Sequence, residues 1–396
     1  MAPDAAPGRL RRWLATSLTA QALATVLATR VLLFLVAWIG LRAFERLPWY
    51  PAQVPDAFLE QWSWIDGWSR WDTAHYVAIG IFGYGNEASP SHNGGLGFFP
   101  LYPMLMKALA WPLPGPITEA QLAFMAVIIS NVAFFVAAPM FADVVARRTN
   151  HSVARTATLL LCISPFSYFF SAGYSESLFL LTVVASFWFA DRDRWWAAAI
   201  AASLGTATRL VGLAIPPALL LFAWHRKRPL RDLATVTIVS PLGVVTWFLI
   251  TWFVYGDLLA YFTAQENWGG WSEHVWFYVR LFVTDPETTF LGDPRHLIIV
   301  LNVVLWAIWL ATLPWVWRRL DPGIALLTTL LVVMQGVMTW VSLGRYLLPA
   351  IGAFVAFAWL LERPGWRGWP RDVVIVTCTV AVTFLTVLFS HGFWAI

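Results

Sequence analysis

A polar segment in the first fifth of the chain gathers side chains that could move a proton and hold a phosphate. Residues 62–76 have the sequence WSWIDGWSRWDTAHY, so Asp66, Arg70, Asp72 and His75 lie within ten residues of one another. A carboxylate at a water-membrane boundary can take a proton from a hydroxyl, and a neighbouring Arg or His can hold a phosphate leaving group. The segment is therefore a candidate for general-base chemistry, with Asp72 as the base.

The spacing suggests how Asp72 would be presented. If a helix opens at residues 72–76, Asp72 is suited to be its N-cap, and Asp72 and His75 would share a face because they are three residues apart. Both side chains could then meet one substrate. The plainer interpretation is that Asp72 only caps the helix while neighbouring tryptophans pack at the membrane interface. Spacing alone does not decide between the two.

A second candidate position, Glu176, follows Gly173 at a break between two apolar runs. An ionisable group at that depth usually faces a cavity or a partner. It could instead be an acid that favours the dipole at the start of the next helix. Arg209 and Arg345 are expected near the outer ends of their segments, where each is either an anchor that reaches the interface or a cation for a lipid phosphate.

Other chemistry finds little support. Residues 265–274, QENWGGWSEH, carry groups used by sugar sites, but an ordinary solvated loop explains them better. The sequence has no glycine-rich phosphate motif, H-E-x-x-H, G-x-S-x-G or D-x-D. Cys162 and Cys378 each lie inside an apolar run, without metal-type spacing. We expect neither a metal nor a cofactor.

The composition indicates what kind of secondary structure must position the candidate site residues. Apolar residues make up 59% of the chain, charged residues 12%, and the mean hydropathy is +0.65, whereas a soluble domain is roughly 25% charged. The sequence predicts an all-α integral membrane protein, one polytopic domain over 1–396. About eleven transmembrane helices are expected, near residues 20–43, 118–145, 156–172, 175–190, 196–208, 210–224, 233–254, 296–316, 323–343, 346–361 and 373–391. Residues 99–113 are expected to lie in the interface or to dip into the membrane, and the pairs of spans at 156–190 and 196–224 could each be one bent helix or a re-entrant hairpin instead.

The basic residues indicate orientation. With a cytoplasmic N-terminus, most of the 26 Lys and Arg residues fall in cytoplasmic loops. Because they are spread over several short loops, membrane orientation explains them better than a nucleic-acid partner. Two long loops, 44–98 and 255–295, then face outward. Nucleotide sugars and ATP would not reach an outward site, but a lipid-linked substrate would.

Five motifs in order over about residues 60–215 resemble the PIG-V-type mannosyltransferases of the GT-C class. They are SRWDTAHY at 69–76, GY at 83–84, FFPLYP at 98–103, AGYSESLF at 172–179 and ATR at 207–209. The resemblance implies a GT-C-type bundle with a catalytic first outward loop, a polyprenyl- or dolichyl-phosphate sugar donor, inversion at the sugar, no obligatory metal, and Asp72 as general base. Around it we expect the substrate to meet Trp71, His75, Asp66, Arg70, Tyr76, Glu176, Arg209 and Arg345.

The resulting hypothesis is a membrane glycosyltransferase of a bacterial plasma membrane, with its active site on the extracytoplasmic face. It would move a mannose-like sugar to a lipid or glycan acceptor among membrane lipids. The rival is a transporter or lipid flippase, which would bury charges at mid-span and show paired halves. A third interpretation is a structural subunit that assists another enzyme.

Overall fold

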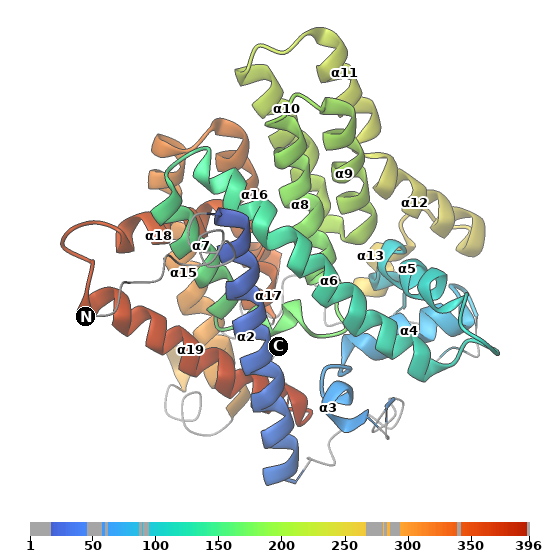
Figure 1. The fold of residues 1–396 in the computed structure, drawn as a ribbon. Coiled ribbons are helices and arrows are strands. Elements are labelled where there is room, and N and C mark those ends of the chain that lie inside the picture. Colours follow the sequence, from blue (N-terminus) through green and yellow to red (C-terminus); the bar gives the residue numbers. More distant parts are fainter. Residues whose placement is uncertain are drawn as a thin grey trace, which may run out of the picture.

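The computed structural model describes residues 17–45, 58–59, 62–86, 89, 95–266, 280, 283–285, 294–338 and 342–393. Every regular element in these ranges is a helix, and the helices form one bundle (Figure 1). Most of the second outward loop that was predicted at 255–295, including residues 267–274 of its polar cluster, lies outside them. The prediction of an all-α membrane protein is confirmed.

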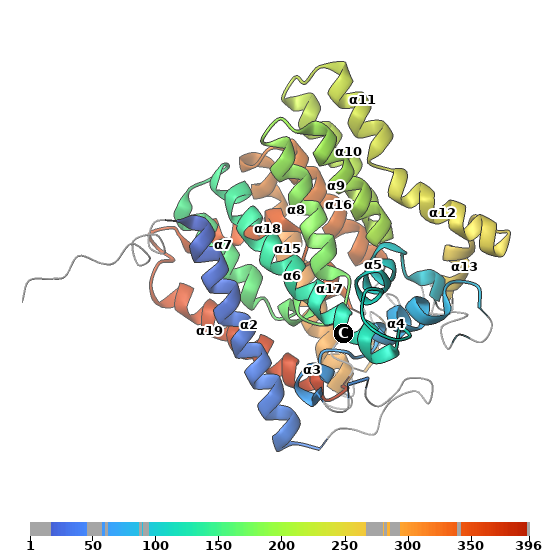
Figure 2. The ribbon, with the colours of Figure 1, turned by 45° about the vertical axis from the view of Figure 1, so that its right-hand side comes forward.

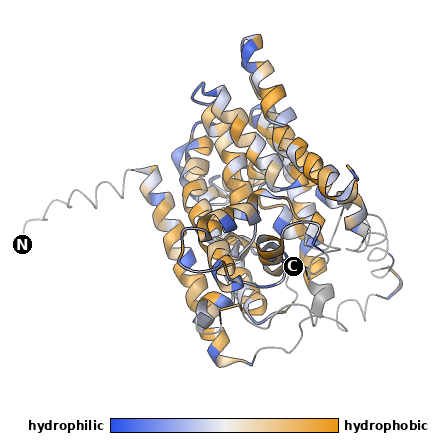
Figure 3. Cartoon of the chain, turned by 90° about the vertical axis from the view of Figure 1, so that its right-hand side faces the viewer, coloured by the Kyte–Doolittle hydropathy of each residue, from blue (hydrophilic) through white to orange (hydrophobic). Residues whose placement is uncertain are grey.

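Five described helical segments are long and apolar enough to cross a membrane: Leu18–Ala43, Glu119–Ala146, Leu230–Tyr255, Ile298–Arg319 and Trp369–Ser390. The first two are α2 and α6. The third is divided at Ser240 and Pro241 into α11 (Leu230–Val239) and α12 (Leu242–Tyr255), because proline cannot donate to the preceding helical turn. The last two correspond to α15 (Pro294–Arg319) and α19 (Trp369–Ser390). Figure 3 shows apolar residues along most of these helices.

The other predicted spans are shorter helices, so the number eleven is not confirmed. They are α7 (His151–Ile163), α8 (Glu176–Ala190), α9 (Trp195–Thr208), α10 (Ile215–His225), α16 (Pro322–Met338) and α18 (Ile351–Leu361). The predicted boundary at 172 is wrong, because α7 ends at Ile163 and the 3-10 helix η3 (Ser167–Phe170) follows it. A second 3-10 helix, η4 (Leu210–Ala214), precedes α10.

The core of the bundle is built around α8. Helices α6 and α9 pack along it, and α2 packs on the other side of α6 (Figure 1). Most of α8 is buried, and its side chains join a continuous apolar cluster with Phe134, Phe170 and Phe222. Helices α11 and α12 run along one edge of the bundle, away from that core (Figure 2).

The predicted first loop is partly helical. It contains α3 (Ser63–Asp66), α4 (Asp72–Phe82) and the 3-10 helix η2 (Gly95–Gly97), and it leads into α5 (Leu101–Ala110). Helix α5 is the predicted interfacial segment and packs on α4 and α6 through Tyr102 and Met106. In the described part of the predicted second loop, α13 (Ala260–Glu266) contacts η2. The described parts of the two predicted loops therefore pack together over one end of the bundle.

Ion pairs join the loops at the opposite end. Arg148, just after α6, pairs with Asp191 at 2.7 Å and also with Asp321. Asp191 in addition pairs with Arg226 at 2.8 Å. Since Asp191 follows α8 and Glu176 begins it, the two acids mark opposite ends of the same buried helix.

Candidate active site

Asp72 is the first residue of α4, and the chain enters the helix through an unusual turn. Trp71 has φ 51° and ψ −111°, and a positive φ is uncommon for a residue other than glycine. The turn is held by two contacts: the Tyr174 hydroxyl accepts from the Asp72 amide at 3.2 Å, and the Thr73 hydroxyl donates to the Gly173 carbonyl at 3.1 Å. The AGYSES segment thus fixes where Asp72 sits.

The expectation that Asp72 caps this helix is wrong. Trp71 occupies the N-cap position, and no side chain caps the helix there. The Asp72 carboxylate instead accepts a hydrogen bond from Arg345 Nη1 at 2.6 Å, across 273 residues of sequence. Its side chain remains 16% exposed. The carboxylate is therefore directed into a tertiary site.

Asp72 lies at one end of a row of four charges. Arg345, in the short helix α17 (Leu343–Tyr346), pairs with Asp72, and its Nε lies 3.7 Å from Glu176 Oε1. Glu176 Oε1 in turn accepts from Arg209 Nη1 at 2.6 Å. Glu176 begins α8 and Arg209 ends α9, so both helices direct these groups to one point. Three predicted site residues, Glu176, Arg209 and Arg345, thus join Asp72.

Aromatic rings surround the two guanidinium groups. Arg345 lies over the rings of Tyr346, Tyr174 and Phe169 at 4.8, 5.3 and 5.5 Å from their centroids. Arg209 lies over Tyr346 at 4.6 Å, and the Tyr346 hydroxyl accepts from Arg345 Nη2 at 2.9 Å. Cations are stabilised over ring faces. The aromatic rings therefore stabilise both guanidinium groups through cation–π contacts and add no further charge to the site.

His75 and Tyr76 occupy the next turn of α4. The His75 ring stacks on Phe98 at 4.9 Å, and the Tyr76 hydroxyl donates to Ser175 Oγ at 2.9 Å. Burial lowers the pKa of His75, although the charge of Asp72 opposes it. Burial also raises the pKa of Tyr76, reinforced by Glu176. Both side chains are therefore neutral near pH 7, so His75 does not carry the positive charge that its predicted phosphate role needs.

Asp66 and Arg70 form a separate pair. Their side chains are 0% and 1% exposed and lie 2.7 Å apart. Asp66 Oδ1 also accepts from the amides of Phe58 and Leu59, and Arg70 Nε donates to the Ser390 carbonyl at the end of α19. Nothing in this arrangement leaves either group open to a ligand. The pair joins the segment between α3 and α4 to the end of α19.

Sequence reasoning missed two residues that shape the site. Asn302, in the middle of α15, accepts from the Gly344 amide at 2.9 Å and so places Arg345. A lone Asn in an apolar span was a usable signal. Tyr261, in α13, has its pKa raised by burial and by Tyr346, against the charge of Arg209, which shows that it is near both. No sequence motif marks Tyr261.

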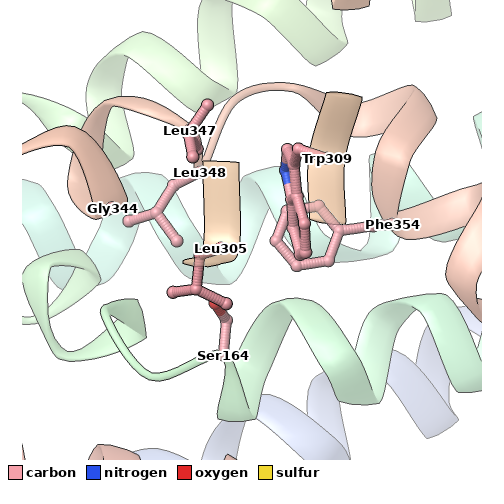
Figure 4. Close-up of a pocket in the computed structure, with 7 residues that line it drawn as sticks. All are labelled: Ser164, Leu305, Trp309, Gly344, Leu347, Leu348 and Phe354. Carbon is pink, nitrogen blue, oxygen red and sulfur yellow. The ribbon is translucent and has the colours of Figure 1, made fainter. Parts of the chain in front are cut away.

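A small cavity lies beside the helix that carries Arg345. Figure 4 shows Gly344, Leu347, Leu348 and Trp309 in its wall, and Ser164 is the one hydroxyl-bearing side chain there. Its lining suits hydrocarbon rather than a sugar. Among the described residues, no three His, Cys, Asp or Glu side chains group as a metal site would require.

These features define a polytopic α-helical membrane protein with a charged site at one end of its bundle. A family model described as mannosyltransferase (PIG-V) matches residues 47–266, more than half of the chain. The chain belongs to the PIG-V mannosyltransferase family, as the motifs suggested. The match includes Asp72, Glu176 and Arg209 but ends before Arg345.

The chain is also similar to curated proteins that are named as mannosyltransferases. GPI alpha-1,6-mannosyltransferase 2 of Mus musculus is 32% identical over 154 residues, which is 38% of this chain and 30% of the relative. The Homo sapiens protein of that name is 30% identical over 170 residues, 41% of this chain and 33% of the relative. The similarity thus spans about a third of the relatives' length.

Solved structures share the fold. ArnT from Cupriavidus metallidurans bound to undecaprenyl phosphate superposes with a TM-score of 0.53 at 16% identity, covering 90% of this chain and 63% of that one. The Archaeoglobus fulgidus oligosaccharyltransferase in the apo form gives 0.52 at 14% identity, covering 97% and 56%. The predicted GT-C-type bundle is confirmed as the fold.

Proposed function

We propose that this protein transfers a mannose-like sugar from a polyprenyl phosphate to a hydroxyl of a lipid or glycan acceptor. The observation that carries the proposal is the row of charges: a partly exposed carboxylate, Asp72, lies at one end, and a partly exposed cation, Arg209, lies at the other. Such a row offers a base and a phosphate site a short distance apart. Family membership and the undecaprenyl phosphate in ArnT support the choice of substrates.

The reaction follows from these roles. The acceptor hydroxyl oxygen attacks the anomeric carbon of the sugar while its proton passes to the Asp72 carboxylate. The bond from that carbon to the phosphate oxygen breaks, and both electrons leave with the phosphate. Arg209, the more exposed of the two cations, stabilises the negative charge that develops there. Attack on the face opposite the leaving group inverts the anomeric configuration. The reaction as written consumes no cofactor.

The remaining predicted residues take supporting roles. Trp71 sets the turn that presents Asp72, and the neutral His75 and Tyr76 line the same helix face as possible hydrogen-bonding groups for the sugar. Asp66 and Arg70 hold the segment in place rather than bind substrate. We propose that this end of the bundle is extracytoplasmic, because the basic loops gather at the other end.

The transporter or flippase interpretation is not favoured. The family match names transferases, and the four charges sit at helix ends rather than at mid-span. The auxiliary-subunit interpretation differs in one respect that can be measured, because it predicts that Asp72 is dispensable.

Asp72→Asn tests the proposal. The purified protein and variant, in nanodiscs, receive decaprenyl-phosphate [³H]mannose with a membrane lipid extract, and labelled product is counted. Loss of the base should lower turnover by about 100-fold or more, the range for one general base. Asp193→Asn, at the opposite end of the bundle and 66% exposed, should behave as wild type. Equal transfer by the wild type and Asp72→Asn would exclude the base role, and no transfer by the wild type would count against the function.

A further inference from the structure

The four charges of the site alternate in sign along a line: Asp72, Arg345, Glu176 and Arg209. The outer two side chains are each 16% exposed, whereas Arg345 and Glu176 between them are 7% and 3% exposed. An incoming ligand therefore meets the ends of the row first. Two carboxylates and two guanidiniums sum to zero, so the row is neutral as it stands.

The pairing in the middle of the row is incomplete. Among the described residues, Arg345 Nε and Glu176 Oε2 are both buried and have no hydrogen-bond partner. Leaving buried polar atoms unpaired costs stability. Arg345 Nε is 3.7 Å from Glu176 Oε1, which is too long for a hydrogen bond. A move of the Arg345 guanidinium from Asp72 toward Glu176 would give both atoms a partner.

We propose that a lipid phosphate bound at Arg209 shifts this pairing along the row and releases Asp72. Arg209 turns from Glu176 to the phosphate, Arg345 turns from Asp72 to Glu176, and Asp72 is left without a cation. The charges require this direction, because one added anion must leave one carboxylate unpaired, and the unpaired carboxylate falls at the far end. The inference rests on the proposed function, in which Asp72 is the base and the donor carries a phosphate.

This exchange sets the order of events. A carboxylate that keeps a guanidinium partner takes up a proton less readily than one that has lost it. Asp72 would therefore become an effective base only after the donor has bound. Glu176 is a positioning residue in this scheme, since it contacts no reacting atom but provides the second position for Arg345.

Glu176→Gln tests the exchange in a variant of nearly equal size. In this variant Arg209 has no ion pair with residue 176 that must break before it can bind a phosphate. Binding of radiolabelled decaprenyl phosphate to the protein in nanodiscs should therefore be as tight as in the wild type or tighter. Arg345 has no second carboxylate, so it should stay on Asp72. We expect kcat for mannose transfer to fall at least tenfold while the donor KM does not rise. A merely structural role would raise the KM as well.

A second change in the same background separates the two possible roles of Arg345. Glu176→Gln with Arg345→Gln removes the cation that holds Asp72, so the double variant should turn over several-fold faster than Glu176→Gln alone. Glu176→Asp keeps the charge and should recover most of the wild-type kcat. A double variant slower than the single one would overturn the proposal, as would a weaker lipid affinity of Glu176→Gln with unchanged kcat.

The wild-type protein provides a test that depends on no variant folding and on no transfer. A water-soluble carbodiimide labels accessible carboxyl groups, and mass spectrometry reads the labelled fraction at each residue. Saturating decaprenyl phosphate should raise labelling of Asp72 severalfold and leave the buried Asp66 unchanged. Unchanged or lower Asp72 labelling would overturn the exchange, whereas the proposed function stands or falls separately on mannose transfer.

Discussion

At the scale of single residues, the first two turns of α4 carry one charged group of the candidate site and two neutral ones. Asp72 begins α4 and pairs with Arg345, while desolvation favours the uncharged forms of the partly exposed His75 and the buried Tyr76 on the next turn. A cationic His75 would compete with Arg345 for Asp72. Its neutrality keeps the row of four charges balanced.

Protonation of His75 should weaken the fold in acid. Because burial lowers its pKa in the folded protein, the unfolded chain takes up the proton first as the pH falls below about 6.5. The stability that His75 contributes is present above that value and is lost below it. His75→Gln should therefore flatten the fall in the thermal unfolding midpoint between about pH 7 and 5. The control His151→Gln, at an exposed side chain, should keep the wild-type slope, and an equal slope for both variants would contradict the prediction.

At the scale of elements, the segment that contains α3 and α4 is attached to the bundle at two places. Asp66 and Arg70 tie its start to the end of α19, and Thr73 ties the start of α4 to Gly173. Each attachment joins parts that are far apart in sequence. The position of Asp72 between them is set by both.

Removing one charge of the Asp66–Arg70 pair should destabilise the protein more than removing both charges. Arg70→Met leaves a fully buried carboxylate without its cation and should lower stability by about 3 kcal/mol. Asp66→Asn together with Arg70→Met keeps an acceptor for the amides of Phe58 and Leu59 and leaves no buried charge. Thermal unfolding in detergent should place the double variant between the wild type and Arg70→Met. A double variant less stable than the single one would contradict this account.

Gly173 is required because α4 passes close to it. A Cβ at this position would lie 2.9 Å from Thr73 Oγ1 and 3.1 Å from Ala126 Cβ. Gly173→Ala should therefore move the start of α4 and lower transfer at least severalfold. Adding Thr73→Ala removes the closest contact and should recover part of the activity. Gly365→Ala, where the added Cβ meets nothing within 4 Å, is the matched control. No recovery in the double variant would count against steric crowding as the cause.

At the scale of the whole molecule, the two ends of the bundle carry different groups of charged residues. One end carries the candidate active site, and the other carries the ion pairs of Arg148, Asp191, Asp321 and Arg226. Helix α8 connects them through the most buried part of the core. Changes at the ion-paired end should therefore alter stability without altering chemistry.

Arg148→Met tests this division. It leaves Asp191, which is 2% exposed, with Arg226 alone, and should lower stability by about 2–3 kcal/mol. Transfer per folded molecule should remain within twofold of the wild type. Arg147→Met removes only an ion pair with Asp143, in which the Arg147 side chain is 44% exposed. It should change stability by less than about 1 kcal/mol. A large loss of kcat in Arg148→Met at full folding would show that the two ends are coupled.

The sequence by itself determined the class of the molecule and most members of its site. Composition alone defines a polytopic membrane bundle, because too few charged residues remain to cover a soluble surface. Local motifs with unusual residues, such as SRWDTAHY and AGYSES, were enough to single out Asp72 and Glu176. Their order along the chain matched the family that the model over residues 47–266 identifies.

Only the tertiary structure decided which partner each of those residues has and how deeply it is buried. Asp72 and Arg345 are 273 residues apart, and no local pattern records which cation meets which carboxylate. In the sequence, Asp66 and Arg70 appeared as suitable for binding substrate as Asp72. In the structure both are buried and form an ion pair that links α3 to the end of α19. Helix boundaries also shifted, since packing around α8 determines where an apolar run turns. Which cation pairs with which carboxylate, and how buried each side chain is, depends on distances in the folded chain. Local sequence patterns do not specify these distances.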